Sequence, residues 1–111
     1  MGRFIYEGGP KLDLDDRTLA HLEVVMTAKI RRREPFAFSW REDVSVGGGR
    51  TTVWIHPDCA LVFKFDAGQS PPINRAWIDA LAFTANSPAG LYVVPEPADV
   101  VSARADARVG A

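Results

Sequence analysis

Large apolar side chains recur at every second position on both sides of a glycine run, and this alternation limits what the chain can fold into. Residues 36–40 read FAFSW, residues 47–49 are three glycines, residues 51–56 read TTVWIH and residues 60–65 read ALVFKF. Alternation with a period of two is typical of strands with one buried face, and glycine-rich segments are typical of the turns between strands. We therefore predict three successive strands in this region, with a flexible hairpin loop at the three glycines.

Parity gives each of these strands one buried and one open face. The set expected to be buried is apolar: Phe36, Phe38, Trp40, Val53, Ile55, Leu61, Phe63 and Phe65. The opposite face carries a mixed set with one large aromatic ring: Ser39, Arg41, Thr52, Trp54, His56, Val62 and Lys64. From the open face we take one candidate binding surface: Arg41, Thr52, Trp54, His56 and Lys64.

The first third of the chain reads as a hairpin followed by a helix. Residues 3–7 and 11–14 have strand-like composition and are separated by Gly-Gly-Pro, which favours a turn. Apolar residues then recur every three or four positions between 19 and 30, as on one side of a helix. Asp15 or Asp16 is the expected N-cap of this helix, and Pro35 prevents its continuation.

A second helix is predicted at about residues 72–86. Its core-facing positions have helical spacing: Trp77, Ile78, Leu81, Ala82 and Ala85. Ser70, before two prolines, offers one capping side chain and Asn74 offers another. Residues 91–94 are predicted as a last short strand, which the following prolines end.

These elements give the order ββαβββαβ, so we predict an α+β fold with two helices on one face of a mostly antiparallel sheet. With 111 residues the chain suits a single domain, which we place at residues 1–97. Residues 98–111 are rich in alanine and have no large aromatic side chain. We expect them to form a disordered tail.

Composition excludes several classes of function. The 13 basic and 14 acidic side chains give a formal net charge of −1, so no whole-protein field attracts nucleic acid or anionic lipid. No apolar segment reaches the ~18 residues of a membrane helix. The single cysteine, Cys59, excludes an internal disulfide, and we expect a cytosolic protein. We expect no cofactor and no metal, because His21, His56 and Cys59 lack paired ligand spacing.

Two short segments resemble catalytic or phosphate-binding motifs. Residues 56–59 read HPDC and place a base, a carboxylate and a thiol together, which is the composition of a nucleophilic site but also of a tight turn. Residues 47–52 read GGGRTT, but a phosphate loop leads into a helix, whereas this segment leads into a strand. We interpret both segments as turns.

A basic cluster lies at the end of the first predicted helix. It consists of Lys29, Arg31, Arg32 and Arg33. Cations at this end of a helix favour the helix dipole by ~0.3–1 kcal/mol each, which predicts a solvated helix terminus. The same cluster, beside a sheet that carries Trp54, is also a candidate patch for binding single-stranded nucleic acid by charge and stacking.

Several blocks along the chain resemble one protein family. They are MGRFIY at 1–6, LAHL at 19–22, RTTVWIHP at 50–57, NRAWIDAL at 74–81, ANS at 85–87 and VPEP at 94–97. The chain resembles short actinobacterial proteins of unknown function that often carry the label "ATP-dependent DNA ligase". The resemblance implies a stand-alone bacterial domain and brings no catalytic residues with it.

The residues themselves argue against ligase activity. Adenylating ligases use the lysine of a Lys-x-Asp-Gly motif as nucleophile. The nearest segments here, KLDL at 11–14 and KFDA at 64–67, both lack the glycine, and the chain is too short for a nucleotide-binding domain.

Three functional hypotheses follow from the sequence. The leading one is a small non-enzymatic module that works through protein–protein contact, as a homo-oligomer or with another protein, at the sheet face or edge that carries Trp54. The second is a nucleic-acid-binding accessory module. The third is an enzyme that uses Cys59 and His56, which requires an accessible and partly ionised thiol.

Overall fold

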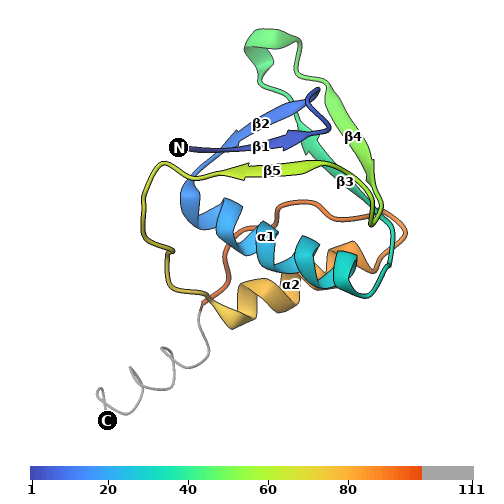
Figure 1. Ribbon diagram of the computed structural model, residues 1–111. Coiled ribbons are helices and arrows are strands. Elements are labelled where there is room, and N and C mark those ends of the chain that lie inside the picture. Colours follow the sequence, from blue (N-terminus) through green and yellow to red (C-terminus); the bar gives the residue numbers. More distant parts are fainter. Residues whose placement is uncertain (99–111) are drawn as a thin grey trace.

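The structure is a computed structural model, and it describes residues 1–98 (Figure 1). The elements are β1 (Gly2–Tyr6), β2 (Lys11–Leu14), α1 (Asp16–Arg31), β3 (Phe36–Arg41), the 3₁₀ turn η1 (Val44–Val46), β4 (Arg50–Ile55), β5 (Leu61–Lys64) and α2 (Arg75–Ala85). None of the described helices has both the length and the apolar character needed to cross a membrane. Except for Ala98, the predicted tail lies outside the described residues.

The strands form two sheets rather than one. A three-stranded sheet has the order β2-β1-β5, a two-stranded sheet pairs β3 with β4, and every pairing between these strands is antiparallel. The α+β class is therefore confirmed, and the single sheet of the prediction is divided into two, because β5 pairs with β1 rather than with β4. Periodicity determines which face of a strand is buried and leaves its neighbour undetermined. Here Phe63 of β5 lies beside Phe4 of β1, with ring centroids 5.5 Å apart.

The core lies between the two sheets and the helices. Both helices lie on the same side of the three-stranded sheet, as Figure 1 shows. The predicted parity is confirmed: Phe38 and Ile55 are fully buried, and Leu61 and Phe63 of β5 pack against the same core. Phe4 occupies the centre, where its ring meets Phe38 and Trp40 edge-on.

The two helices begin at side-chain caps. Asp15 caps α1 by accepting the Thr18 N–H at 3.1 Å, one of the two predicted alternatives. Asn74 caps α2, so this helix begins at Arg75 rather than at residue 72. The side chain of Arg75 forms an ion pair with Asp79 one turn later, at 3.5 Å, and both side chains are exposed to solvent.

The last predicted strand, residues 91–94, is reduced to one parallel bridge between Leu91 and Phe38. Leu91 exchanges backbone hydrogen bonds with Ala37 and Ser39 of β3. The described residues show no further ladder bond to β3 beyond Leu91, and the Tyr92 N–H, on the side away from β3, donates to the hydroxyl of Thr84 on α2. The prediction of a regular strand is therefore wrong beyond its first residue.

The C-terminus of α1 uses an arginine where glycine is usual. The Glu34 N–H donates to the Lys29 carbonyl and the Arg33 N–H to the Ile30 carbonyl, the pattern of a Schellman motif, and Arg33 has a φ of 57°. Replacing Arg33 with glycine should raise the free energy of unfolding by about 0.5–1 kcal/mol, because glycine adopts this conformation without a Cβ penalty. Urea unfolding measures the change. A loss of stability would contradict this interpretation of the cap.

The chain after α2 is tied to both helices by a polar network. Arg17 binds the Glu96 carboxylate through two bonds of 2.8 and 2.6 Å, and Asn74 donates to the same carboxylate at 2.9 Å. His21, which is fully buried, donates through Nδ1 to the Arg17 carbonyl and accepts the Asn74 N–H at Nε2. Segments from three parts of the sequence thus meet at the N-terminus of α2.

This network should make stability depend on pH. The bonds from Arg17 and then Asn74 lower the pKa of Glu96 from 4.5 to about 2. A lowered pKa means that the stabilisation is complete above 4.5 and is lost as the pH falls toward about 2. The stability difference between the native chain and Glu96→Gln, measured by urea unfolding, should therefore shrink from about pH 6 to about pH 2. A constant difference would contradict the prediction, and Glu23→Gln is the control.

Candidate functional site

The outward side of the β3–β4 hairpin forms a small surface in three rows. We call it the outer face; it consists of Ala37, Ser39, Arg41, Arg50, Thr52 and Trp54. The antiparallel register pairs Ala37 with Trp54, Ser39 with Thr52 and Arg41 with Arg50. The middle row is joined by a 2.8 Å bond between the Ser39 and Thr52 hydroxyls. Three of the predicted surface residues, Arg41, Thr52 and Trp54, thus share one face.

Trp54 is the large aromatic residue of this face. Its side chain is 58% exposed, whereas Trp40 and Trp77 are buried in the core. Its backbone is nevertheless fixed, because the Trp54 carbonyl accepts the Tyr6 hydroxyl at 2.7 Å. An exposed indole on a fixed backbone can be covered by a partner without the cost of ordering the chain that carries it.

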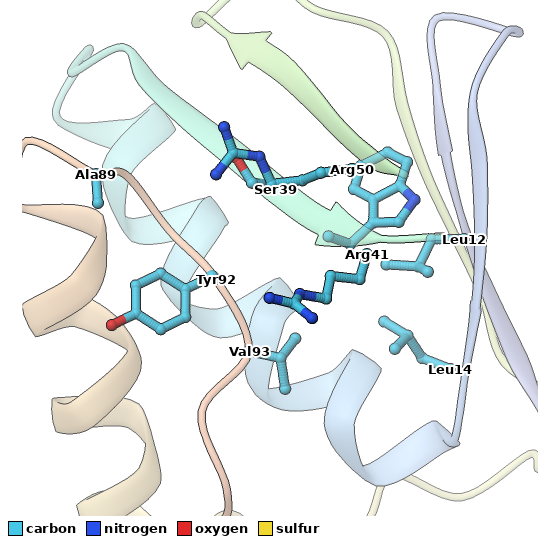
Figure 2. A pocket seen from close by; sticks show the side chains of 9 residues that line it. Leu12, Leu14, Ser39, Arg41, Arg50, Ala89, Tyr92 and Val93 are labelled. Atoms are coloured by element: carbon cyan, nitrogen blue, oxygen red, sulfur yellow. The ribbon is translucent and has the colours of Figure 1, made fainter. Parts of the chain in front are cut away.

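The two arginines at the other end of the face border a hollow of about 530 Å³. Figure 2 shows the Arg41 guanidinium extending between the apolar side chains of β2 and those of the segment after α2, whereas the Arg50 guanidinium lies over Ser39. The other lining residues are Leu12, Leu14, Ser39, Trp40, Ala89, Tyr92 and Val93. We call this cavity the arginine hollow.

The charge of the arginine hollow is not balanced locally. Among the residues that the structure describes, neither Arg41 nor Arg50 has an ion pair or a side-chain hydrogen bond, and no carboxylate lines the cavity. Like charges directly opposite each other on two strands destabilise a sheet. An anionic or π-electron-rich group placed over them would offset this repulsion.

The remaining predicted surface residues lie elsewhere. Lys64 is on the three-stranded sheet, because β5 pairs with β1, and it borders a polar hollow with Asp13 and Asp66. His56 lies just past the end of β4, where its Nδ1 accepts the Asp58 N–H at 3.3 Å. Neither residue belongs to the outer face.

The structure also separates the predicted basic cluster. The side chain of Lys29 is only 8% exposed and donates to the Asn86 side chain at 2.5 Å. Arg32 is paired with Glu34 at 2.8 Å. Arg31 and Arg33 are exposed, so two of the four cations face solvent without a partner among the described residues.

A family model described as "Domain of unknown function (DUF7882)" matches residues 1–96. The chain belongs to the DUF7882 family. No curated protein and no solved structure matches it. The matched residues include every helix and strand described above, so the whole α+β fold is the DUF7882 domain.

A second cluster of this DUF7882 domain lies where two turns meet. Glu7, His56 and Cys59 each offer one ligand atom, and these three atoms all lie within 4.8 Å of one another. The sequence places His56 and Cys59 together but gives no sign of Glu7, which arrives through the pairing of β1 with β5. The expectation of no metal site was based only on the spacing of histidine and cysteine in the sequence, which does not show that Glu7 lies beside them.

Proposed function

We propose that this DUF7882 domain works without catalysis, as a module that makes protein–protein contact through its outer face. We further propose that the partner is a second copy of the chain. The exposure of Trp54 on a rigid sheet is the observation that carries the proposal. Tryptophan, tyrosine and arginine dominate binding energy at protein interfaces, and Trp54, Tyr92, Arg41 and Arg50 gather on or beside this face.

The order of the rows makes the outer face complementary to itself. Arg50 and Trp54 lie on β4 with the Thr52 row between them, so they are about 13 Å apart. Consider a two-fold axis that lies in the contact plane, perpendicular to the strands, and passes through the Ser39–Thr52 row. This axis reverses the strand direction of the second copy. Each Arg50 then lies over the partner's Trp54. A guanidinium over an indole is a favourable cation–π pair, and a two-fold axis forms it twice.

Sedimentation velocity tests the proposal. We expect a dimer that persists at high salt, because apolar contact is strengthened rather than screened by salt. Replacing Trp54 with serine should raise its dissociation constant about 30-fold, the effect of losing about 2 kcal/mol at an interface anchor. Phe83→Ser is the matched control, since Phe83 is 78% exposed on α2, outside the outer face.

Two results would contradict this function. The first is a native chain that stays monomeric over the accessible concentration range. The second is a dimer that Phe83→Ser weakens and Trp54→Ser leaves intact, which would place the interface on α2.

A second candidate function is binding of single-stranded nucleic acid. One observation favours it: two unpaired guanidinium groups and two exposed rings, Trp54 and Tyr92, lie on the same side of the hairpin. Stacking and phosphate contacts would then share the surface. Affinity for an oligonucleotide should in that case fall steeply as salt rises, in contrast to the dimer.

Under this proposal the domain has no ligase activity, despite the label that similar proteins carry. An accessory role near DNA repair and an actinobacterial origin are implied only by the resemblance. Residence in the cytosol is part of the proposal, and it is supported by the single cysteine of the chain.

A further inference from the structure

The turn after β4 brings a histidine and a cysteine to the same place. The Cys59 N–H donates to the His56 carbonyl at 3.0 Å, which closes a four-residue turn with Pro57 at its second position. The Cys59 sulfur in return accepts the His56 N–H at 3.2 Å. The turn thus fixes the positions of two side chains that are both strong ligands for transition metals.

A second turn brings a carboxylate to this pair. Glu7 lies in the turn between β1 and β2, and its N–H donates to the Ala60 carbonyl at 2.8 Å, directly after Cys59. Glu7 has a φ of 48° and Gly8 a φ of 71°, which are typical of the two central residues of a type I′ turn. Asparagine, aspartate or glycine usually occupies the position of Glu7 in such a turn. Turn formation therefore does not account for a glutamate at this position.

We propose that Glu7, His56 and Cys59 form a zinc-binding site. The three ligand atoms lie within 4.8 Å of one another. Bonds of about 2.0–2.3 Å to a tetrahedral zinc ion need closer spacing, and the Glu7 side chain is exposed, so it is free to rotate on binding. Thiolate, imidazole and carboxylate together suit zinc better than magnesium or calcium, which prefer oxygen ligands. Three protein ligands leave the fourth position to water.

Proton balance gives the site a pH dependence. Cys59 must bind as the thiolate, so zinc binding releases its proton to solvent, while His56 binds through a ring nitrogen of the neutral imidazole. Among the described residues, the thiol donates only in long contacts, 3.8 Å to the Tyr6 hydroxyl and 3.7 Å to the Trp54 carbonyl. Zinc affinity should therefore rise with pH.

Two measurements on the full chain test the site. Isothermal titration with zinc chloride, after removal of bound metal, should give one zinc ion per chain. Titration with cobalt(II) should give a sulfur-to-cobalt charge-transfer band, which requires direct coordination by the thiolate. Each of Cys59→Ser, His56→Gln and Glu7→Gln should weaken zinc binding by about 100-fold or more, since even loss of an outer partner costs 10–100-fold.

Asp58→Asn is the matched control, because it changes a carboxylate in the same turn that is not one of the three ligands. It should bind zinc as the native chain does. The proposal is overturned by the absence of the charge-transfer band, or by zinc affinity that survives Cys59→Ser. Circular dichroism of each variant without metal shows that it is folded.

Discussion

Replacing Phe4 with alanine should lower the free energy of unfolding by about 3–5 kcal/mol. The Phe4 side chain has 0% exposure, and its ring lies 5.4 Å from Phe38 and 5.5 Å from Phe63. It therefore joins the β3–β4 sheet to the three-stranded sheet. Alanine would leave a cavity where both sheets contact the same ring, and urea unfolding measures the loss.

The matched control for this change is Phe83→Ala. Phe83 is mostly exposed on α2, so its replacement should change stability by about 0.5 kcal/mol or less. A Phe4→Ala variant that loses less than about 1 kcal/mol would show that the sheets do not pack through this ring.

Replacing Asn74 with alanine should cost about 3 kcal/mol of stability. Its Oδ1 caps α2 by accepting the Ala76 N–H at 3.0 Å, and loss of a cap costs about 1 kcal/mol. Its Nδ2 donates to Glu96 and, at 2.8 Å, to the Pro97 carbonyl. Alanine removes both bonds and leaves the Pro97 carbonyl without this donor, whereas Glu96 keeps Arg17, and this loss costs a further 1–3 kcal/mol or so. Thermal or urea unfolding measures the sum.

Asn74→Asp separates the two contributions. Aspartate keeps the cap but removes both donors, and it places a second carboxylate against Glu96. We expect it to be at least as destabilising as Asn74→Ala. A stable Asn74→Asp variant would mean that the bonds to the segment after α2 contribute little.

Much of the fold could be predicted from the sequence because its signals are local. The alternation at Phe36, Phe38 and Trp40 correctly identifies the buried face, and Pro35 correctly ends α1 before β3. The neighbour of β5 could not be predicted, because pairing with β1 or β4 satisfies the same alternation. The bond between the Tyr92 N–H and the hydroxyl of Thr84 on α2, just past the single bridge at Leu91, is likewise a contact that no pattern in the sequence indicates.

The candidate site was predictable to the extent that it depends on parity. Trp54 and Arg41 share an open face because they lie at outward positions of paired strands. Arg50 was missed because its role requires the exact register of the hairpin. Lys29 was placed with the exposed cations because sequence gives no sign that Asn86 lies opposite it.

A mixing experiment tests the central claim, that the outer face pairs with itself, most directly. In the proposed dimer, Trp54→Ser and Arg50→Ser each remove both copies of the cation–π contact when the variant pairs with itself. A mixed dimer of the two variants keeps one intact contact, between Arg50 of the first chain and Trp54 of the second. Sedimentation velocity with one variant labelled should therefore show a mixed dimer that is tighter than either variant dimer. A mixed dimer no tighter than either would contradict the account.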